Sequence, residues 1–133
     1  MLKYIIIFLI FSILGWIYEY ILFNRRGPDD ILNIYFNIKL PFITLYGLAG
    51  VLLILIYENT KEYSMIIKLL ITFIVLNLLE CWAGLYTYGV YGFQAWKYDY
   101  NRIPFCYGYI SIITGLWWTF LSFIIFKGLE LLS

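Results

Sequence analysis

One apolar stretch, residues 69–88, sets the strongest limit on what this chain can fold into. It reads LLITFIVLNLLECWAGLYTY and holds a single charged residue, Glu80. About 20 apolar residues in a helix cross the roughly 30 Å hydrocarbon core of a bilayer. An acid inside such a helix costs on the order of 3 kcal/mol, so it normally faces protein or water rather than lipid. The stretch therefore predicts a transmembrane helix with a sheltered carboxylate.

The composition extends this prediction to the whole chain. Its 133 residues are 64% hydrophobic and 13% charged, whereas a soluble domain is about 45–50% apolar and about 25% charged. Such a chain could not cover its own surface with polar groups. We expect an all-α integral membrane protein, a single membrane domain over residues 1–133, with the lipid bilayer as its main partner. A net charge of +1 gives no reason to expect a nucleic-acid partner.

Four apolar segments are long enough to be membrane spans, at about residues 4–23, 41–57, 65–88 and 104–126. Their short connections predict a four-helix, up-down bundle. Pro41 and Pro104 would stand in the first turns of the second and fourth spans, where the missing N–H does no harm. Between the first two spans, residues 29–39 are expected to form a short interfacial helix capped by Asp29 or Asp30.

The basic residues leave the orientation of this bundle almost balanced. The face with both termini has four of them and the other face has five: Lys3, Lys61, Lys68 and Lys127 against Arg25, Arg26, Lys39, Lys97 and Arg102. The positive-inside rule therefore does not decide between the two orientations. The arginines lie close to helix ends, which slightly favours the cytoplasm for the face with the longer loops.

The chain also reads as two helical hairpins of one design. Leu40-Pro41-Phe42 followed by Tyr46-Gly47 opens the second span, and Ile103-Pro104-Phe105 followed by Tyr107-Gly108 opens the fourth. Each is preceded by a helix with a carboxylate, Glu19 or Glu80. These would be parallel half-repeats, related by an axis along the membrane normal. The alternative is that proline and tyrosine are simply favoured at the interface.

The two carboxylates should lie toward the same membrane face. Ser12, Gly15 and Glu19 share one helix face by their spacing, and Asn77 lies one turn before Glu80. Two helix N-termini, which favour anions, start on that same side. We therefore expect a polar pocket there, and an acid with aromatic walls could hold an organic cation. The candidate ion- or substrate-binding residues are Glu80, Glu19, Asn77, Trp16, Tyr46 and Tyr107; the candidate rim residues are Arg25, Arg26, Trp96, Asp99 and Arg102.

Each of these residues also has a purely structural interpretation. Glu80 could make a hydrogen bond between helices, and Glu19 could pair with Arg25 or Arg26. The tryptophans and tyrosines could be anchors at the lipid headgroups. Asp99 could order the loop that contains it.

We expect no catalytic residue, metal site or cofactor. The chain has no histidine, which removes the commonest metal ligand and neutral-pH base. Its two cysteines, Cys81 and Cys106, lack the spacing of metal ligands. We interpret them as two buried thiols, with a bridge between them as the alternative.

Several of these motifs, in this order and spacing, resemble one family over nearly the whole chain. It is the CmpB-like family, a permease-like ABC-transporter type IV group of small polytopic membrane proteins. The motifs are Ser12-Ile-Leu-Gly15-Trp16-x-x-Glu19, Arg26-Gly27, Leu40-Pro41-Phe42 with Tyr46-Gly47, Leu79-Glu80-x-x-x-Gly84, Trp96-Lys97-Tyr98-Asp99-Tyr100 and Ile103-Pro104-Phe105.

The resemblance implies a component of a transport system, although the chain departs from the family in its loop. Lys97 stands where the family usually has an acid, and the acid appears at Asp99 instead. The chain also lacks a GxxxxGK[ST] phosphate-binding loop, so an ATPase would have to be a separate subunit.

Three functions remain open from the sequence. The first is a transport component that binds or conducts an ion or small cation at Glu19 and Glu80, as a homo-oligomer or with a heteromeric membrane partner. The second is a non-catalytic accessory subunit, with Gly15, Gly50, Gly84 and Gly115 on its contact faces. The third, and least favoured, is an enzyme that acts on lipid with Glu80 or Asp99 as base.

Overall fold

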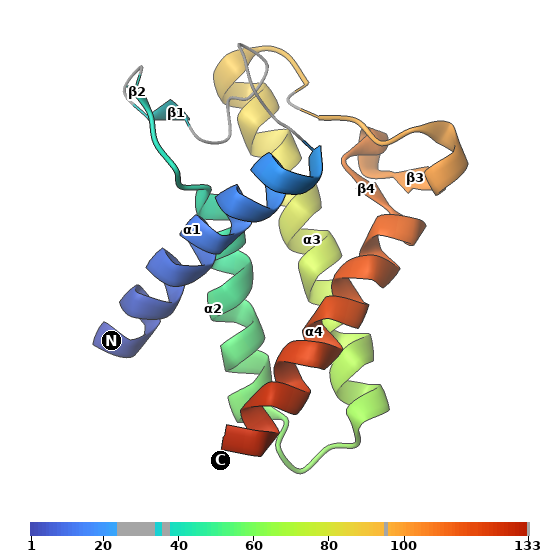
Figure 1. Cartoon of the computed structure of the whole chain (residues 1–133). Coiled ribbons are helices and arrows are strands. Elements are labelled where there is room, and N and C mark those ends of the chain that lie inside the picture. The colour runs from blue at the N-terminus through green and yellow to red at the C-terminus, as the bar shows by residue number, and fades with distance from the viewer. Residues whose placement is uncertain (24–33, 36–37, 95, 133) are drawn as a thin grey trace. The chain divides into compact units, whose positions relative to one another are not determined.

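A computed structural model describes residues 1–23, 34–35, 38–94 and 96–132. Helices make up most of this described part: α1 (Leu2–Phe23), α2 (Thr44–Asn59), α3 (Met65–Tyr91) and α4 (Ile112–Leu132) (Figure 1). Short antiparallel strands pair as β1 (Ile34–Tyr35) with β2 (Ile38–Lys39), and as β3 (Pro104–Phe105) with β4 (Ile110–Ser111). Two 3-10 turns, η2 (Tyr100–Arg102) and η3 (Cys106–Gly108), lie next to β3. The predicted all-α class is thus confirmed at the level of the dominant structure.

The chain is an integral, multi-pass membrane protein. Within the described residues, three segments are long and apolar enough to cross a membrane: Leu2–Ile21, Met65–Tyr91 and Ile112–Leu132. At 27 residues, α3 is roughly 40 Å long, which exceeds the roughly 30 Å hydrocarbon core. The apolar helix α2 has 16 residues and is about 24 Å long.

The chain forms two compact units, Met1–Leu52 and Leu53–Ser133, and the boundary between them falls inside α2. In the first unit, α1 packs against the first half of α2. In the second unit, α3 packs along α4, and the hairpin of β3 and β4 precedes α4 (Figure 1). The core of the second unit is formed by Leu53, Ile56 and Phe126.

Helix ends in the second unit follow from local residues. Ser64 caps the start of α3, because its hydroxyl accepts a hydrogen bond from the Ile67 amide. Gly92 ends α3 in a left-handed conformation with φ of 77°, which glycine adopts without strain. Ser111 begins α4 by accepting from the Thr114 amide at 3.0 Å.

The predicted start of the fourth helix is wrong. The helix begins at Ile112 rather than at Pro104. Cys106, Tyr107 and Gly108 have φ angles of 52°, 59° and 89°, and such left-handed residues cannot continue a right-handed helix. The chain turns back instead, so that Pro104 pairs with Ser111 and Phe105 with Ile110.

Two smaller predictions about the first unit also need correction. The helix α2 begins at Thr44, so Pro41 precedes the helix instead of standing in its first turn. In the segment 29–39, Ile34–Tyr35 and Ile38–Lys39 pair as β1 and β2 rather than forming an interfacial helix. Isoleucine and tyrosine favour such strands. The proposed caps Asp29 and Asp30 lie outside the described residues.

Candidate functional site

Glu19 is almost completely buried in the first unit, with 7% of its surface exposed. Its carboxylate Oε1 accepts a hydrogen bond from the Tyr46 hydroxyl at 2.5 Å. The predicted helix face is confirmed, because Ser12 and Gly15 are buried as well. The structure therefore unites two of the predicted binding residues, Glu19 on α1 and Tyr46 on α2.

The absence of a side chain at Gly15 makes this contact possible. The ring of Tyr46 lies so close that a Cβ atom at Gly15 would be 2.2 Å from its Cγ atom. The segment before α2 is docked on α1 too, since the Ile43 amide donates to the Ser12 carbonyl at 3.0 Å. Phe42 meets Phe8 edge to face, with ring centroids 5.8 Å apart. Together these contacts bring Tyr46 to Glu19.

In the second unit, half-buried Glu80 also accepts a hydrogen bond from a tyrosine. Its Oε1 atom receives the hydroxyl of Tyr98, from the stretch that follows α3. The backbone of Tyr98 is held in turn, because its amide donates to the Gly108 carbonyl at 2.9 Å. We call the described residues between 92 and 111 the cap, since they fold back onto α3 at the level of Glu80.

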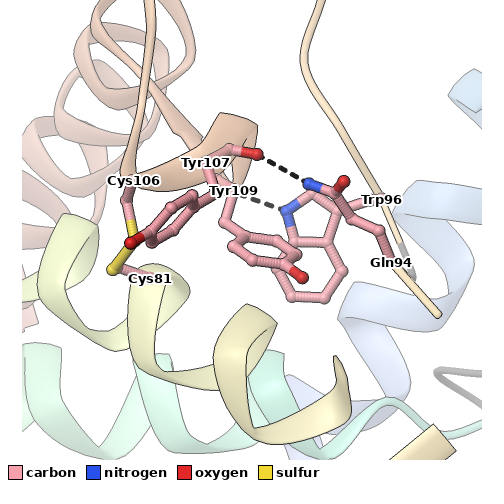
Figure 2. The surroundings of a disulfide bond; sticks show 6 residues. All are labelled: Cys81, Gln94, Trp96, Cys106, Tyr107 and Tyr109. Carbon is pink, nitrogen blue, oxygen red and sulfur yellow. Dashed lines mark hydrogen bonds between the residues drawn. A yellow bond between two sulfur atoms is a disulfide. The ribbon is translucent and has the colours of Figure 1, made fainter. Parts of the chain in front are cut away.

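A disulfide joins the cap to α3 next to this carboxylate. It links Cys81 to Cys106, whose Cα atoms are 6.0 Å apart (Figure 2). The interpretation of two separate buried thiols is therefore wrong, and the alternative of a bridge holds. The physical reason is the turn at η3, which returns Cys106 to the residue that follows Glu80.

Side-chain contacts complete the cap (Figure 2). The Gln94 amide donates to the Tyr107 carbonyl at 2.7 Å, and the Trp96 indole donates to the Tyr109 carbonyl at 2.9 Å. The Tyr109 ring is only 2% exposed and rests on Gly84, where a Cβ atom would be 2.3 Å from it. Burial raises the pKa of the Tyr109 hydroxyl, and the nearby Tyr88 raises it further.

The hydrogen bond that Tyr46 donates to Glu19 has a counterpart at Glu80, but Tyr107 is not its donor. Its side chain is 81% exposed, and its carbonyl is used within the cap. The donor to Glu80 is Tyr98, which was not among the residues predicted from the sequence. The only signal for it was its place in the motif Trp96-Lys97-Tyr98, because a contact made by a returning loop leaves no helical spacing to read.

The other candidate residues have structural contacts in the described parts. The Asn77 amide donates to the Phe73 carbonyl at 2.8 Å and lies against Gly115. Trp16 stacks on Tyr20 with centroids 5.1 Å apart.

The rim candidates of the second unit belong to the cap. Asp99 is exposed, and its carbonyl accepts from the Arg102 amide at 3.0 Å. The guanidinium of Arg102 donates to the Thr114 hydroxyl at 3.3 Å. Arg25 and Arg26 lie outside the described residues.

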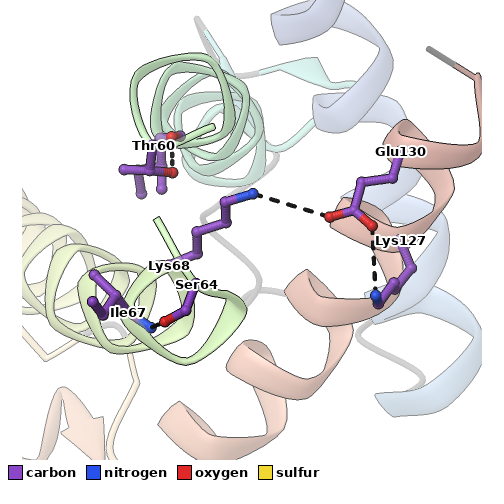
Figure 3. A network of polar contacts seen from close by, with 7 residues as sticks. Thr60, Ser64, Ile67, Lys68, Lys127 and Glu130 are labelled. Atoms are coloured by element: carbon purple, nitrogen blue, oxygen red, sulfur yellow. Dashed lines mark hydrogen bonds and ion pairs between the residues drawn. The ribbon is translucent and has the colours of Figure 1, made fainter. Parts of the chain in front are cut away.

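A second polar cluster lies at the opposite end of α3. Lys68 is 6% exposed, and its ammonium is 4.0 Å from a carboxylate oxygen of Glu130 (Figure 3). The same ammonium lies 5.5 Å from the centroid of the Tyr57 ring. Lys127 contacts the other oxygen of Glu130 at 3.5 Å. The end of α2, the start of α3 and the end of α4 thus meet at Lys68, which contacts Tyr57 on α2 and Glu130 on α4.

The pocket expected between Glu19 and Glu80 would join the two units, so it stays a prediction. Each carboxylate lies on an apolar helix and accepts a hydrogen bond from a tyrosine hydroxyl. Within the described residues, no three acidic, cysteine or histidine side chains gather as a metal site would require.

Comparison with known proteins places the chain in a family. No curated protein and no solved structure matches it. A family model described as "Putative ABC-transporter type IV" matches residues 6–132, nearly the entire chain. The resemblance expected from the motifs is confirmed, and the protein belongs to this ABC-transporter type IV family.

Proposed function

We propose that this protein is a transport component whose carboxylates Glu19 and Glu80 bind a small cation. Membership of the family supports a role in transport in a general way. The proposal that the carboxylates bind a cation rests on one observation. Both acids lie on apolar helices, and each accepts a hydrogen bond from a tyrosine hydroxyl.

The architecture that fits this proposal is one membrane domain of four antiparallel spans. In this architecture α2 is the fourth span, besides α1, α3 and α4. The helix α2 is shorter than the hydrocarbon core of the bilayer, and the apolar residues 40–43 before it supply part of the length that it lacks. The two carboxylates then lie toward the same membrane face, in parallel half-repeats. The tyrosine partners come from different positions in the two halves, Tyr46 after Pro41 and Tyr98 before Pro104. Spans of this size enclose little volume, so we propose a homo-oligomer or a heteromeric partner, with any ATPase on a separate chain.

Substitution of the carboxylates tests the proposal. Purified protein is reconstituted into liposomes, and fluxes of Na⁺, K⁺, protons and choline are compared for wild type, Glu80→Gln and Glu19→Gln. Glutamine keeps the shape and can still accept the tyrosine hydroxyl, but it removes the charge. We expect each glutamine variant to lose flux while its melting temperature stays close to that of wild type.

Matched tyrosine variants separate a role in binding from a role in folding. Tyr98→Phe and Tyr46→Phe remove the hydrogen bond and keep the carboxylate charge. They should lower the stability while retaining most of the flux. If the glutamine variants carry cations as well as wild type does, the carboxylates are structural and the proposal is wrong.

The glycines do not favour the alternative of an accessory subunit. In that alternative, four glycines lie on faces that contact other proteins. In the structure, aromatic rings of the same unit lie on them: Tyr46 on Gly15, Phe11 on Gly50, Tyr109 on Gly84 and Phe73 on Gly115.

A further inference from the structure

The disulfide between Cys81 and Cys106 indicates on which side of the membrane the cap lies. We infer that the cap lies on the extracytoplasmic, oxidising side and is fastened to α3 there by this bond. The inference concerns only the second unit. It stands whether or not Glu80 binds a cation.

Contacts other than the disulfide already bring the two cysteines together. Glu80, the neighbour of Cys81, receives the Tyr98 hydroxyl. One turn further along α3, Gly84 receives the Tyr109 ring. The Cα atoms of the cysteines are 6.0 Å apart, inside the range of about 4.4–6.8 Å that a disulfide needs. The bond therefore belongs to the folded cap and requires no rearrangement of it.

The chemistry of the bond assigns its compartment. When it forms, both S–H bonds break, one S–S bond forms, and two protons and two electrons leave. The electrons pass to the disulfide of a thiol–disulfide oxidoreductase, which becomes a dithiol. Stable disulfides form and persist outside the cytosol, whereas cytosolic thiols are kept reduced. A structural disulfide in the cap therefore points to the extracytoplasmic face.

The basic residues of the second unit allow this orientation. Lys61, Lys68 and Lys127 lie at the end opposite the cap, around Tyr57 and Glu130, where the positive-inside rule favours them if that end is cytoplasmic. The two basic residues of the cap have structural contacts: the stem of Lys97 covers Gly108, and Arg102 donates to Thr114. The orientation is therefore opposite to the one slightly favoured by the arginine positions in the sequence.

Labelling of single cysteines in intact cells tests the orientation. In a background with Cys81→Ser and Cys106→Ser, one variant carries Tyr100→Cys in the cap and a matched one carries Glu62→Cys in the turn between α2 and α3. Both positions are exposed, Tyr100 at 94%. A membrane-impermeant maleimide should label position 100 in intact cells and position 62 only after permeabilisation. The reverse pattern, or labelling of both positions in intact cells, would overturn the inference.

The redox state of the native cysteines is measured in parallel. Cells with the wild-type chain are quenched in acid, and the denatured protein is treated with a polyethylene glycol maleimide with or without prior reduction. We expect no adduct before reduction and two adducts after it. Free thiols in the quenched sample would remove the basis of the inference. If the variant with Cys81→Ser and Cys106→Ser fails to fold, Tyr100→Cys and Glu62→Cys are each introduced into the wild-type chain. The native cysteines do not react with maleimide there, because they are joined by the disulfide.

Discussion

At the scale of single residues, the contacts of this protein depend on aromatic rings that lie directly on glycines. The ring of Tyr46 fills the space beside Gly15, and the ring of Tyr109 fills the space beside Gly84. Tyr46 itself donates a hydrogen bond to Glu19, and Tyr109 belongs to the cap, from which Tyr98 donates a hydrogen bond to Glu80. The glycines are thus part of the support of Glu19 and Glu80.

Gly84→Ala should destabilise the second unit. The added methyl would lie 2.3 Å from the ring of Tyr109, which is buried and has little room to move. Such overpacking typically lowers the free energy of unfolding by about 1–3 kcal/mol. Thermal unfolding in detergent measures it. The control is Gly89→Ala on the same helix, where no atom lies within 4 Å. It should leave the stability unchanged or raise it, by up to about 1 kcal/mol.

Tyr46→Phe should lower the stability of the first unit, because it takes a hydrogen-bond donor from buried Glu19. The loss of one such hydrogen bond typically costs about 0.5–1.5 kcal/mol. The same change at exposed Tyr100 should alter the free energy of unfolding by less than about 0.5 kcal/mol. Equal effects at both positions, in denaturant titrations of the purified protein, would contradict the importance of the bond to Glu19.

At the scale of elements, the helices were predictable and the connections were not. Runs of apolar residues predicted α1, α3 and α4, because about 20 consecutive apolar residues are typical of a transmembrane helix. The start of α4 was misplaced, since the proline at position 104 suggested a first turn. The deciding residues were Cys106, Tyr107 and Gly108, whose backbone is left-handed. Glycine adopts this conformation readily, but Cys106 and Tyr107 have no local preference for it and are held there by the fold of the cap.

Ser111→Ala should weaken the start of α4. The Ser111 hydroxyl is buried and accepts from the Thr114 amide at 3.0 Å, and the loss of such a cap costs about 0.5–2 kcal/mol. The matched variant is Ser64→Ala at the start of α3, where the corresponding bond is exposed and 3.4 Å long. Chemical unfolding should show the larger loss for position 111. A larger loss for position 64 would contradict this ranking of the caps.

Lys68 and Glu130 should contribute only weakly as an ion pair. Their charged atoms are 4.0 Å apart, the Glu130 side chain is 40% exposed, and Lys127 shares the same carboxylate. A double-mutant cycle with Lys68→Met and Glu130→Gln should therefore give a coupling free energy below about 1 kcal/mol. A coupling of several kcal/mol would show that the pair is essential for joining α3 to α4.

At the scale of the whole molecule, composition settled the class of protein and motif order settled its family. The arrangement around the carboxylates was only partly predictable. The spacing of Ser12, Gly15 and Glu19 revealed a buried face, because a helix repeats regularly. The partner Tyr98 was not identified, and the bridge from Cys81 to Cys106 was only the alternative interpretation, because a loop that returns to a helix has no such period. The pocket between Glu19 and Glu80 remains a prediction.

Reduction of the disulfide should destabilise the protein as a whole. The bond closes a loop with a sequence separation of 25 residues, for which chain entropy predicts a stabilisation of about 3 kcal/mol. Thermal unfolding with and without reductant measures the loss. The variant with Cys81→Ser and Cys106→Ser should melt like the reduced wild type and should not respond to reductant. A bridge that contributes nothing would leave all four curves together.

The packing of rings on glycines also restricts how this protein can diverge over evolutionary time. A side chain at position 84 costs less stability once position 109 has lost its ring, and the same holds for positions 15 and 46. The two residues of each pair are therefore expected to be inherited together. An alignment of relatives should show the columns of each pair changing together.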